Sequence, residues 1–367
     1  MKVLHILNEL KPSGGETMLK SAAPQWCSVD EHVILSTGDR VGSYSTVLHQ
    51  SGYEILHLPF RKSLSFFKGF AALLKAGSYD IVHIHTERAA PLYALVARFS
   101  APGKPVIFRT VHHFFRFDGV LRIRKMLERH MMKYLLGVKF LSNSPSGVRN
   151  EKRRYGMTNA YAPNWYDSGL FSPPNEEDVR KARSSLGWPD DLTVFVSLGG
   201  NWPYKNYDRV VKALAEIPAH HKLLYVQIGV QGDGSPLETL ANELGVTERL
   251  HCAGIVKDVL PLLWAADAYL MPSTEEGFGI AAVEAMAVGL PAILGEVEAL
   301  TDFRETVEGL RFVRPEAIPI AEAMVEFIKL GRTKLRERGL AHSLDVREHY
   351  GLEVGPVAYL KAWNSTS

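Results

Sequence analysis

The sequence contains very little cysteine. Among its 367 residues only Cys27 and Cys252 are cysteines, and they lie far apart in the chain. Two distant thiols cannot build a disulfide framework or a zinc site based on cysteine ligands. Their scarcity favours a reducing compartment.

Long hydrophobic runs and an excess of one charge are also lacking. No window approaches the roughly 18 apolar residues that cross a membrane. The N-terminus enters a strand-like run at residues 2–7 without the apolar core of a signal peptide. The net charge of +2 does not indicate a nucleic-acid-binding protein. We therefore expect a globular, cytoplasmic protein.

What the sequence does contain is a regular alternation of short apolar runs and amphipathic stretches. This alternation predicts βαβ units and parallel sheets. The length favours two domains, and a stretch rich in proline and acidic residues at 163–189 separates them. The apolar runs are residues 3–7, 32–36, 55–58, 81–85, 106–110 and 139–142, then 194–198, 223–228, 250–253, 268–271 and 292–294.

The predicted fold class is α/β, with two Rossmann-like doubly wound parallel-sheet domains that face a cleft. Residues 1–165 form the first domain, residues 166–345 form the second, and residues 346–367 form a terminal helix. The tail from about residue 317 to residue 363 reads as consecutive helices. Ligands of such sheets bind at the carboxyl ends of the strands, so the functional residues should directly follow strands.

The strongest signal is the segment 271–291, which reads MPSTEEGFGIAAVEAMAVGLP. Glu276 precedes a helix expected from about residue 279, and Glu284 follows eight positions later. The amides of Phe278 to Ile280 at the helix start can bind a diphosphate, and Gly277 and Gly279 allow close approach. Glu284 can accept hydrogen bonds from a ribose diol, and Glu276 can meet a sugar. A solvated turn before an ordinary helix is the alternative.

This segment resembles the hallmark motif of the retaining family 4 glycosyltransferases of GT-B fold. Its two glutamates are spaced as in that family, with Pro-Ser before them, Gly-Phe-Gly between them and Ala-Met-Ala after them. The resemblance extends through most of the chain. It implies that the first domain binds the acceptor, that the second domain binds a nucleotide-sugar donor, and that the terminal helix crosses back to the first domain. It also implies transfer with retention at the anomeric carbon and no divalent metal.

A second segment of the predicted donor domain follows the apolar run 194–198. Gly199 and Gly200 allow a tight turn, and Lys205 can meet phosphate oxygens. The family usually has arginine where this chain has Asn201 and glycine where it has Asn206. This departure would leave Lys205 as the main cation of the diphosphate site. A surface lysine at a helix start is the alternative.

Two further turns resemble donor-site turns of the family. Residues 252–258 match the segment whose backbone reads the nucleobase, and Gly254 and Val256 would flank the base. Gly229 and Gly232 resemble the turn after the second strand, although a lone glycine pair is nonspecific. Backbone contacts do not identify the base, but we expect a UDP-sugar rather than a GDP-sugar.

In the first domain, Gly14 and Gly15 open a helix, and their amides could reach the donor diphosphate across the cleft. His112 matches the family histidine that points at the donor sugar, whereas a buried core histidine is the alternative. A neutral imidazole there can donate a hydrogen bond to the sugar or to developing charge.

Two other histidines share one face of a strand, because His83 and His85 are two positions apart. No cysteine or third suitably spaced ligand accompanies them, so we expect no metal site. His85 lines the acceptor side or serves as a hydrogen-bonded structural histidine.

The catalytic candidates are therefore His112, Glu276 and Lys205. No motif supplies a nucleophilic carboxylate beneath the anomeric carbon, so the resemblance implies front-face attack, with the leaving diphosphate accepting the acceptor's proton. We expect neither a cofactor nor a metal. The acceptor would be a glycan, a lipid-linked saccharide of polysaccharide biosynthesis, or a small molecule. Alternatives are a sugar-nucleotide epimerase of the same architecture and a non-catalytic partner subunit.

A membrane surface is a further candidate partner. Residues 120–136 form a basic amphipathic pattern, and residues 149–154 and 61–68 add positive charge. Basic residues beside bulky apolar ones suit peripheral binding to an anionic bilayer. A core-packed helix with a solvated basic side is the alternative.

Overall fold

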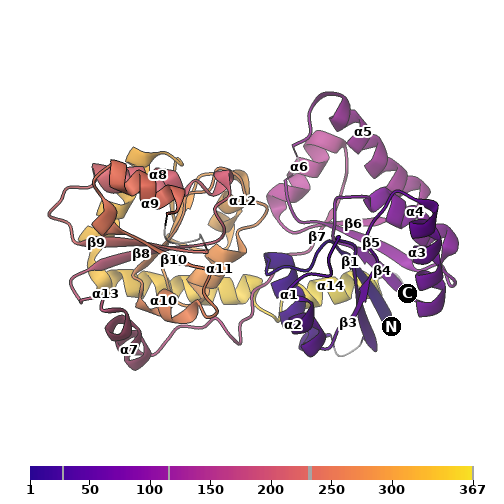
Figure 1. The fold of residues 1–367 in the computed structure, drawn as a ribbon, viewed down its shortest axis with the longest axis horizontal. Coiled ribbons are helices and arrows are strands. Elements are labelled where there is room, and N and C mark those ends of the chain that lie inside the picture. Colours follow the sequence, from indigo (N-terminus) through magenta and orange to yellow (C-terminus); the bar gives the residue numbers. More distant parts are fainter. Residues whose placement is uncertain (27–28, 115, 230–233, 366–367) are drawn as a thin grey trace. The chain divides into compact units, whose positions relative to one another are not determined.

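The computed structural model describes residues 1–26, 29–114, 116–229 and 234–365, so Cys27 and Gly232 lie outside the described residues. The chain forms two compact units (Figure 1). Unit 1 contains Met1–Tyr166 and Leu352–Ser367, and unit 2 contains Asp167–Gly351. Residues 346–351 of the predicted terminal segment therefore belong to unit 2.

Unit 1 is built on a parallel sheet of seven strands in the order β3-β2-β1-β4-β5-β6-β7. The strand order reverses between β1 and β4, which is where doubly wound sheets bind their ligands. The strands are β1 (Lys2–Leu7), β2 (Glu31–Ser36), β3 (Glu54–His57), β4 (Ile81–Ile84), β5 (Val106–Val111), β6 (Lys139–Ser142) and β7 (Ala160–Tyr161).

Helices cover both faces of this sheet. Side chains along each strand therefore alternate between two hydrophobic clusters, one on each face. Leu4 and Ile84 pack with α3 and α4, whereas Val3 and Phe108 pack with α1 and α14. The helices are α1 (Gly14–Ala22), α2 (Ser45–Gln50), α3 (Leu64–Gly77), α4 (Ala90–Ser100), α5 (Gly119–His130), α6 (Pro145–Tyr155) and α14 (Gly355–Asn364), with the short helices η1 (Ala23–Gln25) and η2 (Met131–Leu135).

The C-terminal helix α14 is part of unit 1. The indole of Trp26 donates to the carbonyl of Pro356 over 3.1 Å, and Tyr359 donates its hydroxyl to Thr110 over 3.2 Å. Gly355 sits against Trp165, where an added Cβ would approach the ring to 2.4 Å. The Tyr359 ring also stacks on His83 of β4, and Trp363 contacts His5 of β1, so α14 packs against β1, β4 and β5.

Unit 2 has a parallel sheet of six strands in the order β10-β9-β8-β11-β12-β13. Its strands are β8 (Thr193–Leu198), β9 (Leu223–Ile228), β10 (Leu250–Gly254), β11 (Ala268–Met271), β12 (Ala292–Gly295) and β13 (Arg311–Val313). Its helices are α7 (Glu176–Leu186), α8 (Tyr207–Glu216), α9 (Pro236–Glu243), α10 (Leu260–Ala265), α11 (Ile280–Ala287), α12 (Glu298–Thr301) and α13 (Ala317–Tyr350), with η3 (Pro203–Lys205), η4 (Thr247–Arg249) and η5 (Asp302–Glu305).

The prediction of two α/β domains with parallel sheets is confirmed. The sequence pattern missed β7 and β13, which have two and three residues and lie at sheet edges. A strand of two or three residues is too short to show a periodic pattern in the sequence, so only its pairing with a neighbouring strand identifies it. Among the described residues, no helix has both the length and the apolar content that crossing a membrane requires.

Candidate functional site

Two of the predicted donor residues of unit 2, Lys205 and Glu276, are in contact, and Glu276 lies in the loop after β11. Lys205 Nζ donates to Glu276 Oε1 over 2.7 Å, and the Ser273 hydroxyl donates to the same oxygen over 2.9 Å. The charged pair is largely buried, with side-chain exposures of 14% for Lys205 and 10% for Glu276. A cation and an anion are thus held together at the carboxyl end of the sheet.

Asn206 explains how the chain does without the family's glycine at this position. Its backbone is left-handed, with φ of 62°, a conformation that asparagine tolerates better than most other residues. Its side-chain amide donates to the carbonyls of Pro272, over 3.1 Å, and Pro315, over 2.8 Å. The substitution keeps the turn and ties Lys205 to the end of β11.

The turns after β8, β9 and β10 are joined by backbone hydrogen bonds. Gly199 N donates to Ile228 O over 2.8 Å, and Gly229 N donates to Gly254 O over 2.7 Å. A Cβ on Gly229 would lie 2.9 Å from Gly199 O, so the two turns require a glycine there. The structure therefore brings Gly199 and Gly254 to one edge of the sheet. Near them Gly200 and Val256 are half-buried and Asn201 is exposed.

Helix α11 begins at Ile280, one residue after the expected position, with Gly279 as its N-cap at φ of 96°. The amides of Ala282 and Val283 donate to Gly279 O. The amides that precede them have no acceptor within the helix, as at the start of any helix. Gly277 is buried. The Phe278 ring packs on Phe303 and Tyr350, so its side chain belongs to the core.

Glu284 is buried in α11, with 8% exposure. Burial, and secondarily the negative charge of Asp167, raises the pKa of its carboxyl group to about 8. The structure describes no hydrogen bond to this carboxyl group from the residues it covers. Glu284 is therefore mostly protonated at neutral pH before any ligand arrives.

In unit 1, Gly14 and Gly15 form the first turn of α1, and both are half-buried. An added Cβ on Gly15 would meet nothing within 4 Å, so the fold itself does not require glycine there. The Ser13 hydroxyl bonds to Glu16 rather than to a backbone amide of the helix. The first turn of α1 thus lacks a side-chain cap.

His112 directly follows β5 and is half-buried. Its Nε2 lies 3.0 Å from Nδ1 of His85, and Asn143 donates its amide to the carbonyl of His112 over 3.1 Å. Burial, and secondarily the charge of Arg109, lowers the pKa of His112 to about 4. The imidazole is therefore neutral at physiological pH.

His5 was not predicted as a site residue. Strand β1 places it beside His83, and ligand nitrogens of His5, His83 and His85 lie within 4.8 Å of one another. The premise that no third possible ligand accompanies His83 and His85 was therefore wrong. Long-range strand pairing supplies that residue. The available signal was that His5 is the single polar residue in the apolar run from Val3 to Leu7.

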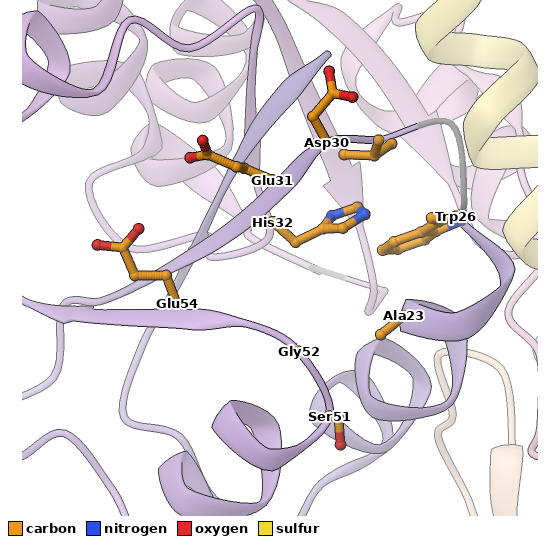
Figure 2. A pocket seen from close by; sticks show the side chains of 9 residues that line it. Ala23, Trp26, Asp30, Glu31, His32, Ser51, Gly52 and Glu54 are labelled. Atoms are coloured by element: carbon orange, nitrogen blue, oxygen red, sulfur yellow. The ribbon is translucent and has the colours of Figure 1, made fainter.

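A pocket of about 390 Å³ lies elsewhere in unit 1 (Figure 2). Glu31 and Glu54, which line it, begin β2 and β3. It therefore opens at the amino ends of parallel strands, whereas His112 follows the carboxyl end of β5. This pocket is separate from the predicted site.

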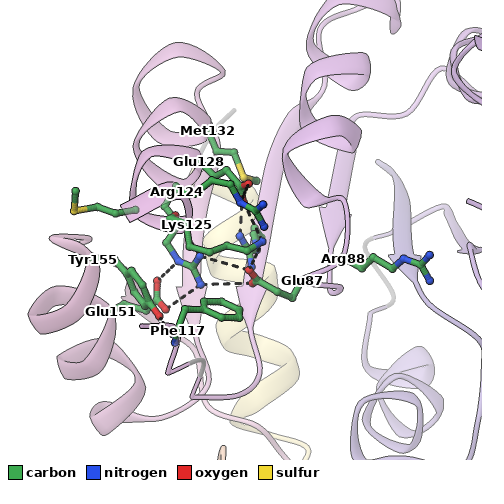
Figure 3. A network of polar contacts seen from close by, with 12 residues as sticks. Glu87, Arg88, Phe117, Arg124, Lys125, Glu128, Met132, Glu151 and Tyr155 are labelled. Atoms are coloured by element: carbon green, nitrogen blue, oxygen red, sulfur yellow. Dashed lines mark hydrogen bonds and ion pairs between the residues drawn. The ribbon is translucent and has the colours of Figure 1, made fainter. Parts of the chain in front are cut away.

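The basic helix α5 is only partly as predicted. Glu87 forms ion pairs with Arg109, Lys125 and Arg129 (Figure 3). Arg129 also bonds to Glu151 over 2.9 Å and is 1% exposed. Lys125 and Arg129, two cations of the predicted basic face, are thus largely buried. Burial also lowers the pKa of Arg109 to about 9. The exposed apolar residues here are Val120, Leu121, Ile123, Leu127, Tyr134 and Leu135.

Comparison with known families gives matches over both units. The family described as Glycosyl transferases group 1 matches residues 178–340. The family described as Glycosyltransferase Family 4 matches residues 13–168.

Three curated relatives illustrate the similarity. UDP-Gal:alpha-D-GlcNAc-diphosphoundecaprenol alpha-1,3-galactosyltransferase of Escherichia coli is 28% identical, over 61% of this chain and 60% of its own length. The lipopolysaccharide core biosynthesis glycosyltransferase LpsE of Rhizobium meliloti is 31% identical, over 43% and 46%. D-inositol 3-phosphate glycosyltransferase of Mycobacterium tuberculosis is 34% identical, over 45% and 35%. The matched stretches thus span from about a third to three fifths of these relatives.

Solved structures show the same fold over nearly the whole chain. HepE of Anabaena in complex with UDP-glucose has a TM-score of 0.84 at 18% identity, covering 100% of both chains. A glycosyltransferase of Rickettsia africae has a TM-score of 0.83 at 18% identity, covering 99% of this chain and 98% of that one.

Proposed function

The chain belongs to the glycosyltransferases of group 1 and family 4, and from this premise we propose that it transfers a sugar from a UDP-sugar to a hydroxyl group, with retention at the anomeric carbon. The observation that carries the proposal is the Lys205–Glu276 pair, just before the start of α11. The UDP-glucose complex of HepE supports the choice of donor class.

In this proposal the diphosphate binds the amides at the start of α11 and the ammonium of Lys205. Glu284 accepts hydrogen bonds from the ribose diol, and Glu276 meets the transferred sugar. The backbone around Gly254 and Val256 flanks the base, while Gly199, Gly200 and Asn201 border the phosphates. Gly14, Gly15 and His112 belong to unit 1, and their proposed role toward the donor rests on the family resemblance.

The proposed chemistry is front-face substitution without a metal. The bond from the anomeric carbon to the diphosphate oxygen breaks, the acceptor oxygen attacks from the same face, and its proton passes to the leaving diphosphate. Lys205 and the helix amides stabilise the negative charge on that leaving group. The enzyme otherwise acts by positioning the two reactants.

We further propose a lipid-linked saccharide as acceptor, used at the cytoplasmic face of an anionic membrane. The E. coli relative is named for a diphosphoundecaprenol acceptor, which supports this class. The exposed apolar residues of α5 and η2, with Arg122 and Arg124 exposed among them, suit the bilayer interface.

A donor panel tests the proposal. Purified protein is screened with UDP-, GDP- and ADP-sugars by thermal shift, since a ligand stabilises the folded state according to its affinity. Release of free nucleoside diphosphate is then measured with undecaprenyl-diphosphate saccharides as acceptors. Acceptor-dependent release of UDP supports the transferase. Epimerised donor with its diphosphate still attached, or no turnover of any donor, would contradict it.

A further inference from the structure

Three histidines of unit 1, His5, His85 and His112, lie on or just after neighbouring strands and on one face of the sheet. His5 is in β1 and pairs in register with His83 of β4, which in turn pairs with Phe108 of β5. His85 is two residues beyond His83, and His112 is four residues beyond Phe108. The line from His5 through His85 to His112 therefore climbs one side-chain layer per strand, toward the carboxyl edge of the sheet.

These three imidazoles are joined by hydrogen bonds. Nδ1 of His5 lies 3.1 Å from Nε2 of His85, and Nδ1 of His85 lies 3.0 Å from Nε2 of His112. We call His5, His85 and His112 the histidine relay. Neighbouring His83 is held separately, because its Nε2 lies 2.8 Å from the Thr110 hydroxyl.

The inner end of the relay is buried. His5 is completely buried, stacked on Trp26 with ring centroids 5.7 Å apart and edge-on to Trp363 at 5.8 Å. Burial lowers the pKa of both His5 and His85 well below the usual value for histidine. Each imidazole is therefore neutral, with one ring nitrogen that donates and one that accepts.

Three neutral imidazoles joined by two hydrogen bonds in series allow only two arrangements of protons. In one, His5 donates to His85, His85 donates to His112, and the proton of His112 is on Nδ1. In the other every bond is reversed, and His5 must keep an N–H on Nε2. That atom is buried and has no hydrogen-bond partner among the described residues. An orphaned buried N–H is rarer than an orphaned acceptor, so the first arrangement is favoured.

We propose that the histidine relay fixes His112 as the tautomer protonated on Nδ1, and that His5 and His85 are positioning residues for this donor. The proposal rests on the proposed function, because the Nδ1–H of His112 would then donate to an oxygen of the transferred sugar. Which ring nitrogen of a histidine carries the proton is set by the hydrogen bond that the other ring nitrogen makes. His5 thereby acts on the reacting group from two side chains away.

A metal ion bound by His5, His83 and His85 is the competing explanation of the cluster. The facing nitrogens of His5 and His85 already satisfy hydrogen-bond geometry. A dication there would have only neutral histidine ligands in an aromatic core, where uncompensated charge is costly. His5 also lacks the outer hydrogen-bond partner that metal-bound histidines usually have. The relay is the better account of these contacts.

Nitrogen-15 NMR of the full chain, labelled at histidine, reads the tautomer directly and needs no turnover. The signals are assigned by comparing the wild type with His112→Gln. We expect His112 to carry its proton on Nδ1 at pH 7.5 and to lose this preference in His5→Phe. A proton on Nε2 of His112 in the wild type would overturn the proposal.

Kinetics then separate positioning from packing. His5→Phe keeps an aromatic ring but removes Nδ1, and should lower kcat about 3–10-fold, the size of one modest hydrogen-bond effect. The affinity for UDP alone should not change, because UDP lacks the transferred sugar that His112 would contact. The matched control is His32→Phe, since His32 also stacks on His5 at 5.7 Å but makes no described hydrogen bond to the relay. The control should alter kcat less than about twofold.

The outcomes distinguish the two proposals. Wild-type protein without transferase activity but with Nδ1–H on His112 would refute the proposed function alone. Active protein in which His5→Phe and His32→Phe behave alike would refute the relay. Activity that is lost on dialysis against EDTA and restored by Zn²⁺ would refute it in favour of a metal site.

Discussion

Lys205 Nζ lies 2.7 Å from Glu276 Oε1, so the cation proposed for the diphosphate and the acid proposed for the sugar are already in contact. The side chains of both residues are mostly buried. The pair therefore holds the groups proposed for the diphosphate and for the transferred sugar side by side before any ligand binds.

Replacing Lys205 by methionine should weaken UDP binding about 10–100-fold, because one charge-assisted contact to phosphate is lost. It should also destabilise unit 2 by about 1–3 kcal/mol, since Glu276 would stay partly buried without its cation. Calorimetric titration with UDP and chemical unfolding measure the two effects. The control is Lys212→Met, which breaks a more exposed pair with Asp208. Equal effects of the two substitutions would contradict the assignment.

The pH dependence of donor binding should depend on Glu284. Because its pKa is raised to about 8, binding a ribose diol to the carboxylate must first remove a proton. UDP affinity should therefore rise between pH 6 and pH 9 in the wild type, and this rise should be absent in Glu284→Gln. Glu322→Gln, an exposed substitution on α13, is the control. An unchanged pH profile in Glu284→Gln would exclude this role.

The raised pKa of Glu284 should also make the stability of the folded chain depend on pH. A folded-state pKa above the unfolded value means that the folded chain binds more protons, so stability decreases as pH rises from about 4.5 through about 8. Ligand-free Glu284→Gln should therefore gain about 1–3 kcal/mol over the wild type at pH 9, and little at pH 4.5. Chemical unfolding at both pH values tests this; a gain that is equal at both would count against it.

Acid should destabilise unit 1 through its buried histidines. Burial lowers the pKa of His32 to about 4, and lowers the pKa values of His5, His83 and His85 as well. The unfolded chain then binds more protons than the folded one below about pH 6.5, so stability falls from there toward pH 4. His32→Phe should reduce this loss by about 1–3 kcal/mol in chemical unfolding. The exposed His220→Gln should leave it unchanged.

Transfer should proceed without a divalent metal. In the proposed mechanism the charge of the leaving diphosphate is met by Lys205 and by helix amides, so no ion is required. UDP release in excess EDTA should stay within about twofold of the untreated rate. Activity that depends completely on added Mg²⁺ or Mn²⁺ would contradict this mechanism.

The exposed apolar residues of α5 should contribute to membrane binding. Ile123 is 55% exposed and Leu127 is 61% exposed. Their double replacement by aspartate should reduce flotation with anionic liposomes at least about tenfold, because it removes apolar anchors and adds repulsive charge. Ile318→Asp alters an apolar residue of α13 with 60% exposure and is the control. Wild-type protein that does not float at low salt would end the membrane proposal.

The sequence predicted most of the fold, because each longer strand is an apolar run that local pattern reveals. It also located Glu276 and Glu284 relative to α11, since both lie within one short segment. It could not predict the pairing of Lys205 with Glu276, which are 71 residues apart. Nor could it predict that His5 would join His85, because β1 and β4 meet only through the strand order of the sheet. The contacts that the sequence did not predict join residues that are far apart in the chain and that the fold brings together.

The left-handed backbone of Asn206 has a consequence for recognising related enzymes. A search pattern that demands glycine at this position would reject the chain, although its turn has the geometry that glycine would allow. Asparagine adds anchors to Pro272 and Pro315 that glycine cannot make. A search for related enzymes should therefore accept asparagine as well as glycine at this position.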